Sequence, residues 1–375
     1  MSFDLFKAPQ KTSAKYASFN LSNNDWRDGV VVRSPNWLGD AAMALPAMYS
    51  LKKILPEKCG FFVVAPENLV SFYESIPWID YVLSIGSGHS SWTPDQLNSL
   101  KKLRAGVGML FVNSLRSAYY FKKGGVKKLF GASNGLRNLF LQKAFKVEWH
   151  KKTGYEECHQ SYKYLNMVYA LGAPIWRQDF PEFEIPKAGE INNPELKSLH
   201  KDKNILVIQP GAAYGLAKRW PEDFFAEVCK TWIKEKNGYI AIVGTREEIE
   251  TAEKVKSAIG NNQRIISLTG KTSLIELMYV LKNSEVCLCN DSGVMHLASA
   301  LNMRGVAIFG STDPFATGPV RGKWVVLLEK QSCSPCFSRE CQNQDHDYRC
   351  LASISPKKVI EALEYIINYN DNNHS

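Results

Sequence analysis

Short apolar runs alternate with segments of helical period along most of the chain, and this alternation predicts parallel α/β architecture. The pattern occurs as two successive series, which indicates two strand–helix domains of similar size. The expected helices include residues 41–55 in the first series and 222–236, 247–259, 273–282, 296–301 and 356–369 in the second. The expected strands are residues 29–33, 61–65, 81–85 and 107–112 in the first series and 205–209, 239–243, 264–267, 286–289, 306–309 and 325–328 in the second.

A polar, turn-rich segment separates the two series. Residues 176–204 contain three prolines, a glycine and several acidic residues, a composition typical of a domain boundary. We therefore expect an N-terminal domain over residues 1–185 and a C-terminal domain over residues 186–355, with a cleft between them. A terminal helix and tail over residues 356–375 could pack back on the N-terminal domain.

Composition and motif searches exclude several classes. The apolar fraction of 45% and the charged fraction of 22% exclude a disordered, collagen-like or coiled-coil chain. No run approaches the ~20 apolar residues that a membrane-spanning helix needs, and residues 1–10 lack the apolar core of a signal peptide, so we expect a cytoplasmic protein. Gly86 and Gly88 are not followed by the third glycine of a dinucleotide-binding fingerprint, which excludes a dehydrogenase of that kind. Gly270 and the lysine after it resemble the end of a phosphate-binding P-loop, but Ile265 stands where that motif needs its first glycine, which excludes a P-loop kinase.

The net charge of +9 is concentrated in the first half of the chain. Residues 1–185 hold 23 Lys and Arg against 15 Asp and Glu, whereas residues 186–375 hold 23 against 22. Residues 101–152 contain 13 basic residues and one acid, interleaved with tyrosine, phenylalanine and leucine. Such a surface suits anionic lipid headgroups or a phosphorylated glycolipid. Nucleic acid would be attracted by the same positive charge. A lysine-rich surface that is only solvated is an equally good interpretation.

Three loops that follow predicted strands carry the residues suited to chemistry. The first leads from a strand into a helix and holds Asn36, Trp37, Gly39 and Asp40. It lies at the carboxyl edge of a parallel sheet, where open α/β proteins bind ligands. Asp40 could cap the helix or, ionised at an ordinary pKa of ~3.9, act as a general base facing the cleft.

The second loop, residues 209–221, is rich in small residues and ends at a helix with Pro221 expected in its first turn. Its small side chains let backbone N–H groups approach a phosphate, and the basic pair Lys218 and Arg219 supplies positive charge. Two adjacent basic residues in a loop can also be merely solvated, but the composition favours phosphate contact.

The third loop, residues 290–296, makes a tight turn through Asp291, Ser292 and Gly293 into a helix. The first N–H groups of such a helix can bind an anion. His296 lies one helical turn further on, and a lone helical histidine is more often a packed or capping residue than a functional one.

Four of the nine cysteines cluster with the spacing C-x2-C-x4-C-x8-C. They are Cys333, Cys336, Cys341 and Cys350, with His346 in the last gap. Such a group could hold a structural zinc ion tetrahedrally. Reduced thiols that fold a surface loop are the simpler interpretation in a cytoplasmic protein.

Taken together, these segments resemble the ADP-heptose:lipopolysaccharide heptosyltransferases of glycosyltransferase family 9, most closely the heptosyltransferase II members. The family has a GT-B fold, in which two Rossmann-like doubly wound domains face a cleft. The N-terminal domain receives the lipid-linked sugar acceptor and the C-terminal domain holds the nucleotide sugar. The resemblance is carried by SPNWLGDAAMALP at 34–46, PGAAYGLAKRWP at 210–221, NDSGVMHL at 290–297, FGSTDP at 309–314 and the cysteine cluster.

The resemblance also implies roles for individual residues. Asp40 matches the family's proposed catalytic base, and Lys218 matches the lysine that contacts the donor diphosphate. The remaining implied donor-binding residues are Gly211, Ala212, Ala213, Arg219, Glu248 near the ribose, Thr272 near the adenine, Asp291, Ser292, Gly293 and His296, and the implied acceptor-binding residues are Asn36, Trp37, Gly39 and Arg116.

The implied reaction is a single inverting displacement. Asp40 takes the proton of an acceptor hydroxyl, which attacks the anomeric carbon of ADP-heptose, while Lys218 and the helix start after Ser292 stabilise the departing ADP. No metal ion is expected to be needed for catalysis. The acceptor would be the first heptose of the lipopolysaccharide inner core, an anionic glycolipid that the basic N-terminal half would meet peripherally at the inner face of the inner membrane.

Other functions stay open on sequence alone. They are a heptosyltransferase I acting on Kdo-lipid A, another GT-B sugar-nucleotide enzyme such as an epimerase, and a basic nucleic-acid-binding protein, for which no binding module is recognised. The chain also departs from the family in its extension before Gly29, which we expect to be an added strand or a loose arm.

Overall fold

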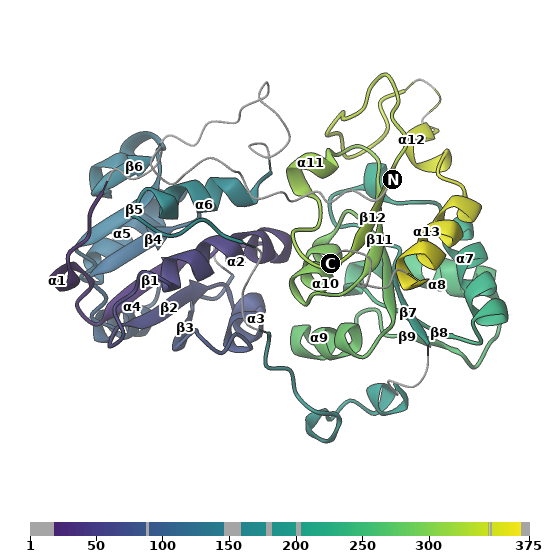
Figure 1. Ribbon diagram of the computed structural model, residues 1–375, viewed down its shortest axis with the longest axis horizontal. Coiled ribbons are helices and arrows are strands. Elements are labelled where there is room, and N and C mark those ends of the chain that lie inside the picture. Colours follow the sequence, from purple (N-terminus) through teal and green to yellow (C-terminus); the bar gives the residue numbers. More distant parts are fainter. Residues whose placement is uncertain are drawn as a thin grey trace, which may run out of the picture. The chain divides into compact units, whose positions relative to one another are not determined.

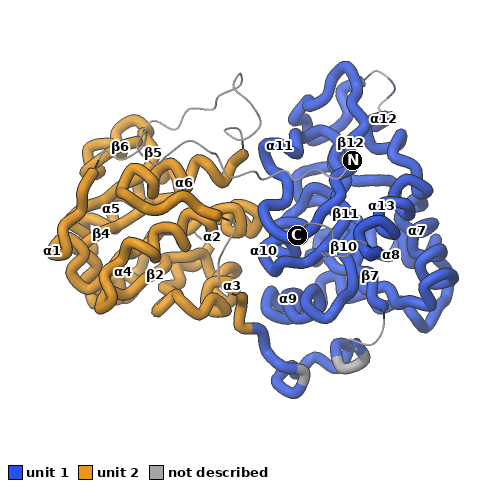
Figure 2. The backbone as a smooth tube through the Cα atoms, in the orientation of Figure 1, with its two compact units in different colours: residues 1–6, 185–375 blue, residues 7–184 orange. Residues whose placement is uncertain are grey.

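The computed structural model describes residues 19–87, 90–145, 159–177, 182–199, 204–343, 345 and 347–368 (Figure 1). The chain divides into two compact units (Figure 2). The N-terminal unit comprises residues 7–184, and the C-terminal unit comprises residues 185–375 together with residues 1–6. The division lies one residue before the expected boundary.

The N-terminal unit is built on a six-stranded parallel sheet in the order β3-β2-β1-β4-β5-β6, the strand order of a Rossmann fold. The central residues Val30, Val31 and Val32 are fully buried, because helices cover both faces of the sheet. The strands are β1 (Gly29–Arg33), β2 (Gly60–Ala65), β3 (Tyr81–Ser84), β4 (Val107–Leu110), β5 (Lys128–Ala132) and β6 (Lys143–Phe145).

The helices of this unit pack in pairs. Helix α2 contacts α6, and α4 and α5 share an apolar cluster with Val31, Val64 and Leu129 of the sheet. The elements are α1 (Asn23–Trp26), α2 (Leu38–Lys52), η2 (Glu67–Leu69), α3 (Val70–Glu74), α4 (Pro94–Lys102), α5 (Leu115–Lys123), η3 (Gly135–Phe140) and α6 (Ser161–Tyr169).

Part of the extension before β1 packs on the N-terminal unit. Residues 19–28 contain the single turn α1, whose Trp26 is buried. Asp25 Oδ1 lies 2.7 Å from Lys128 Nζ at the start of β5. This part of the extension is therefore neither an added strand nor a loose arm, and residues 1–18 lie outside the described residues.

The C-terminal unit repeats the same topology. Its parallel sheet has the order β12-β11-β10-β7-β8-β9, which is again the Rossmann order when the strands are numbered within the unit. The doubly wound α/β organisation predicted from the sequence is thus confirmed. The strands are β7 (Ile205–Gln209), β8 (Tyr239–Ile242), β9 (Ile265–Ser267), β10 (Val286–Asn290), β11 (Gly305–Phe309) and β12 (Trp324–Leu328).

One face of this second sheet is covered by α7, α8 and α13, whose apolar side chains join Trp220 and the strands in a single cluster. The helical elements are η5 (Ala188–Glu190), η6 (Pro194–Ser198), η7 (Leu216–Lys218), α7 (Glu222–Glu235), η8 (Arg246–Glu248), α8 (Ile249–Ile259), α9 (Leu274–Lys282), α10 (Gly293–Ala300), α11 (Pro314–Thr317), α12 (Arg349–Ala352) and α13 (Pro356–Asn368).

The terminal helix α13 corrects one expectation. It was expected to be able to pack on the N-terminal domain, but its residues Val359, Leu363 and Ile366 are buried in the apolar cluster of the C-terminal unit. Their spacing of four and three residues forms one helical stripe, and that stripe is covered by α7, β11 and β12. Within the described part of the chain, no helix is both long and apolar enough to cross a bilayer.

Candidate functional site

Each sheet has a point where the strand order reverses, and in open α/β sheets ligands bind outside the carboxyl ends of the strands at that point. In the N-terminal unit the reversal lies between β1 and β4, which are followed by residues 34–40 and 111–116. In the C-terminal unit it lies between β7 and β10, which are followed by residues 210–220 and 291–296 (Figure 2). The three predicted functional loops therefore lie where the topology of their own unit places a ligand.

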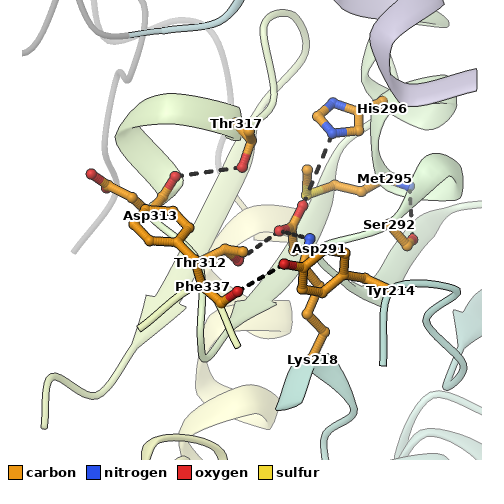
Figure 3. A network of polar contacts seen from close by, with 10 residues as sticks. All are labelled: Tyr214, Lys218, Asp291, Ser292, Met295, His296, Thr312, Asp313, Thr317 and Phe337. Atoms are coloured by element: carbon orange, nitrogen blue, oxygen red, sulfur yellow. Dashed lines mark hydrogen bonds and ion pairs between the residues drawn. The ribbon is translucent and has the colours of Figure 1, made fainter. Parts of the chain in front are cut away.

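Lys218 and Asp291 are the centre of a polar network in the C-terminal unit (Figure 3). Lys218 Nζ lies 2.5 Å from Asp291 Oδ2, and the two side chains are only 14% and 3% exposed. The hydroxyl of Thr312 donates to the same carboxylate oxygen at 2.6 Å. An isolated buried carboxylate would be strongly unfavourable, so Asp291 needs both the Lys218 ammonium and the Thr312 hydroxyl. The ion pair in turn holds the ammonium of Lys218 at the carboxyl edge of the sheet.

The loop that carries Lys218 is fixed by two further contacts. Asn290, fully buried at the end of β10, accepts the backbone N–H of Trp220 at 3.1 Å and donates to the carbonyl of Pro210 at 2.8 Å. The hydroxyl of Tyr214 donates to the carbonyl of Phe337 at 2.7 Å. Both ends of the loop are thus tied to one amide side chain, and its middle is tied to a neighbouring segment.

A second polar group lies beside this loop at the ends of β7 and β8. Gln209 Nε2 donates to Glu248 Oε1 at 2.9 Å, and the backbone N–H of Thr245 donates to Glu248 Oε2 at 2.8 Å. A Cβ at Gly211 would lie 2.1 Å from Glu248 Oε1, so only glycine lets the loop pass this close to the carboxylate. Gln209 Oε1 is buried and has no partner among the described residues, which leaves an acceptor for a ligand N–H or hydroxyl.

The remaining predicted donor-binding residues have different environments. Arg219 donates to the carbonyl of Ala212 at 3.3–3.4 Å and to the Thr251 hydroxyl at 3.3 Å, so its guanidinium braces the loop. Ala213 is exposed, and Ser292 caps α10, whose first residue is Gly293. Thr272 is half-buried in the segment between β9 and α9, at the same sheet edge as Glu248.

Asp40 lies in the first turn of α2 in the N-terminal unit. The N-cap of this helix is Trp37, so the interpretation of Asp40 as the cap is wrong. Its carboxylate accepts a hydrogen bond from Gln160 Nε2. Burial raises the pKa of Asp40, while the charge of Lys163 and the Gln160 hydrogen bond oppose that rise. A carboxylate with a raised pKa is a stronger base.

The loop before Asp40 is organised by a buried arginine. Arg33, at the end of β1, donates to the carbonyl of Ser34 at 2.5 Å and to Asn36 Oδ1 at 2.6 Å. Burial lowers its pKa to about 10, so the guanidinium stays charged at neutral pH. Of the other predicted acceptor residues, Trp37 is 70% exposed, Gly39 is half-buried, and Arg116 is exposed in the first turn of α5.

Comparison with known proteins decides the family. The model of glycosyltransferase family 9 (heptosyltransferase) matches residues 97–346. This chain belongs to glycosyltransferase family 9. It is therefore an enzyme that transfers a sugar, as the sequence predicted.

Several relatives of this family 9 glycosyltransferase are known. Lipooligosaccharide heptosyltransferase 2 of Campylobacter jejuni is 26% identical over 339 residues, which covers 90% of this chain and 98% of that protein. Lipopolysaccharide heptosyltransferase 2 of Escherichia coli is 24% identical over 351 residues, with coverage of 90% and 98%. The solved structure of Escherichia coli ADP-heptose lipopolysaccharide heptosyltransferase II has a TM-score of 0.71 at 23% identity and covers 90% of this chain and 98% of that chain. The predicted GT-B fold class is confirmed by this likeness.

His296 is a buried neighbour of the central ion pair in this glycosyltransferase. Its Nε2 lies 4.0 Å from Asp291 Oδ1 (Figure 3), and its Nδ1 has no partner among the described residues. Its pKa is lowered to about 4, mainly by burial; the charge of Asp291 opposes this shift and the charge of Lys218 contributes to it. The imidazole is therefore neutral at neutral pH and contributes no positive charge to the site.

We expect His296 to make stability depend on pH. The unfolded imidazole takes up a proton near its ordinary pKa of 6.5, whereas the folded one resists protonation until about pH 4. The free energy of unfolding should therefore fall by about 3 kcal/mol as the pH drops through this window, and this contribution should stay constant below it. Chemical denaturation of wild type and His296→Gln across the window measures the effect. Equal pH slopes for the two proteins would contradict it.

The four clustered cysteines lie in the segment between β12 and α12 and at the start of α12. Among the described residues, none of Cys333, Cys336, Cys341 and Cys350 forms a disulfide bond. The pKa of Cys350 is raised to about 11, mainly by burial and also by its three cysteine neighbours. Among the residues that the structure describes, no group of three or more His, Cys, Asp or Glu is arranged to hold a metal ion; His346 is not among those residues.

A triplet of the form Asp-x-Asp, which can offer two carboxylates to a metal ion, stands at residues 345–347. It was not considered when catalysis without a metal ion was expected. Asp345 Oδ2 lies 3.1 Å from Arg349 Nη2, and Asp347 Oδ2 pairs with Arg349 Nε. Both carboxylates of the triplet therefore already have a cationic partner on α12.

Several residues of these networks were missed from the sequence. Gln160 and Lys163 lie on or beside α6, far along the chain from Asp40, and no local pattern signals that contact. Thr312 lies inside the FGSTDP segment that carries the family resemblance, and Asn290 is a polar residue closing an apolar strand. Asn290 offered a signal, because a polar side chain at the end of a buried strand needs a specific partner.

Proposed function

We propose that this glycosyltransferase is a heptosyltransferase II, which moves L-glycero-D-manno-heptose from ADP-heptose onto the first heptose of the lipopolysaccharide inner core. The observation that carries the proposal is the buried Lys218–Asp291 pair at the strand-order reversal of the C-terminal unit. Lipooligosaccharide and lipopolysaccharide heptosyltransferases 2 match over nine-tenths of this chain, and one solved relative is named for ADP-heptose.

The donor would be held by the C-terminal unit. Lys218 would place its ammonium against the diphosphate, and the backbone N–H groups at the start of α10 would face the same phosphates. The small residues Gly211, Ala212 and Ala213 would let the backbone approach the donor closely. Glu248, with the unpaired acceptor of Gln209, would bind ribose hydroxyls, and Thr272 would lie at the adenine.

The acceptor would be bound by the N-terminal unit through Asn36, Trp37, Gly39 and Arg116. Asp40 would take the proton from the acceptor hydroxyl as its oxygen forms a bond to the anomeric carbon. The bond from that carbon to the diphosphate oxygen breaks in the same step, and ADP departs with the electron pair. Attack opposite the leaving group inverts the anomeric configuration.

The neighbours of Asp40 give a prediction about pH. Lys163 and Gln160 both lower the pKa of Asp40, so Lys163→Met or Gln160→Leu should raise it. If Asp40 is the base, the acid limb of the kcat/KM profile should move to higher pH in either variant. Lys163→Arg keeps the charge and should leave the limb in place. An acid limb unmoved by both substitutions would remove Asp40 from the base role.

The donor and acceptor are tested directly with purified protein. ADP release should be observed with ADP-heptose and a heptosyl-Kdo-lipid acceptor, and not with ADP-heptose and Kdo-lipid A alone. UDP-sugars should not serve as donors, so they should give no UDP release with the heptosyl-Kdo-lipid acceptor. Release with Kdo-lipid A alone would instead indicate a heptosyltransferase I. Conversion of a sugar nucleotide without any acceptor would indicate an epimerase.

The place of action follows from the acceptor. We propose that the enzyme works in the cytoplasm as a peripheral protein at the inner face of the inner membrane. Residues 101–145 of the N-terminal unit contain ten basic residues and no acidic one, and such a surface would be attracted to anionic lipid.

A further inference from the structure

Four large apolar side chains are exposed on adjacent elements of the N-terminal unit. Leu136 and Leu139 of η3 are 72% and 82% exposed, and Leu115 and Tyr119 of α5 are 46% and 45% exposed. The two elements pack together, with the ring of Tyr119 edge-on to that of Phe140 at a centroid distance of 6.3 Å. We call Leu115, Tyr119, Leu136 and Leu139 the leucine surface.

The two leucines of η3 are held outward by the geometry of that element. Residues three apart in a 3-10 helix share a face, so Leu136 and Leu139 project together. Between them Arg137 turns inward and is almost fully buried, where its Nη1 donates to the carbonyl of Val112 at 2.7 Å and to Asn113 Oδ1 at 3.0 Å. A buried guanidinium anchored in this way fixes the opposite face toward solvent.

Side-chain hydrogen bonds also fix the segment that leads into η3. Asn138 Oδ1 accepts the backbone N–H of Asn134 at 2.9 Å, and Asn138 Nδ2 donates to the Ser133 hydroxyl at 2.9 Å. Asn134 Nδ2 donates to the carbonyl of Asn113 at 3.2 Å. The asparagine side chains of this loop are thus used in hydrogen bonds within the protein, whereas its leucine side chains are exposed. In an ordinary solvated loop the polar side chains face the solvent instead.

Basic residues accompany the leucine surface. Lys123 is exposed and its Nζ lies 5.6 Å from the ring centroid of Tyr119. Lys127 and Lys143 are also exposed, and residues 101–145 contain no acid. An apolar area beside an exposed cation, on a segment of the chain that is basic and contains no acid, complements a layer with an apolar interior and anionic headgroups. Nucleic acid would match the lysines but leave the leucines without a partner.

The position of the leucine surface in the fold supports the same partner. Helix α5 follows β4 and η3 follows β5, so both begin at the carboxyl edge of the sheet, where Asp40 follows β1. We propose that the leucine surface inserts at an anionic membrane surface, with Lys123 on the headgroups, and so turns the acceptor-binding edge toward lipid-linked sugar. Its link to the acceptor rests on the proposed function, whereas the lipid binding does not.

The test is co-sedimentation of the full chain with phosphatidylcholine vesicles prepared with and without phosphatidylglycerol. Wild type should bind the anionic vesicles and release at about 0.5 M salt, where charges are screened within about 4 Å. Leu136→Gln combined with Leu139→Gln should lower the affinity for anionic vesicles about tenfold, because the variant loses two apolar side chains that would enter the membrane. Both side chains are mostly exposed, so the fold should not depend on them. Tyr365→Gln, at an aromatic side chain on α13 of the other unit that is 46% exposed, is the control and should bind as wild type.

The outcomes separate this proposal from the proposed function. Transfer to a deacylated, lipid-free acceptor should be unchanged in the double leucine variant. Undiminished vesicle binding by that variant would overturn the membrane surface even if transfer proceeds normally. Wild-type self-association that the variant abolishes, without vesicle binding, would also overturn it and assign the surface to a second copy of the chain. Absence of transfer by wild type would instead count against the proposed function alone.

Discussion

Replacing Asp40 with asparagine should lower kcat about a thousandfold, within the range expected when a positioned general base is removed. The amide has the shape of the carboxylate and can still accept the hydrogen bond from Gln160, but it cannot take a proton. Binding of ADP, measured by calorimetry, should be unchanged, because the residues proposed to hold the nucleotide belong to the other unit. Steady-state transfer assays measure the loss of turnover.

The stability of this variant should not fall. Burial raises the pKa of Asp40, so the ionised carboxylate is less favourable in the folded protein than in the unfolded chain, and a neutral amide removes that penalty. Asp28→Asn is the matched control, since Asp28 is a half-exposed residue of the same unit paired with Arg104. Near-normal turnover by Asp40→Asn would show that another group accepts the proton.

Replacing Lys218 with methionine should have the second largest effect, a loss of kcat of about 100- to 1,000-fold. The ammonium is the charge proposed to meet the diphosphate as ADP departs. The same substitution should lower the free energy of unfolding by about 3–5 kcal/mol, because Asp291 would remain buried without its cation. Transfer kinetics and chemical denaturation measure the two effects separately.

A second substitution separates catalysis from stability. Lys218→Met combined with Asp291→Asn should recover most of the lost stability, because no uncompensated charge is left, but it should stay inactive. Lys254→Met removes a lysine from an exposed pair with Glu250 in the same unit and should change neither property measurably. An active double variant would contradict the assignment of Lys218 to the diphosphate.

The fold could be predicted largely because its signal is local. The central strands of both sheets are continuous apolar runs, since they are buried on both faces, and the structure places them within one or two residues of the expected positions. Strands β5 and β6 were missed. Strand β5 begins with Lys128 and contains Gly131, and the short strand β6 begins with Lys143, so the surrounding lysines obscured the buried residues Leu129 and Phe130. Charges of this kind are ordinary on strands near a sheet edge.

The site was predictable only in part, because only some of its residues are neighbours in the sequence. Residues 210–220 and 291–296 are each contiguous, so their small residues, lysine and helix start could be interpreted from the sequence. The contact of Asp40 with Gln160 joins positions 120 residues apart, and only the packing of α2 on α6 brings them together. One helix start was misjudged, because Trp37 rather than Asp40 is the N-cap of α2, whereas α7 begins at the expected residue Glu222 with Pro221 as its N-cap.

In the reaction proposed for this enzyme, one displacement at the anomeric carbon moves heptose from ADP-heptose to a heptose acceptor. The most direct test is nuclear magnetic resonance of the product formed by purified protein from ADP-heptose and a heptosyl-Kdo acceptor. We predict an acceptor longer by one heptose, whose new linkage has the anomeric configuration opposite to that of the donor. A product with retained configuration, or an unmodified acceptor beside intact ADP-heptose, would contradict the account.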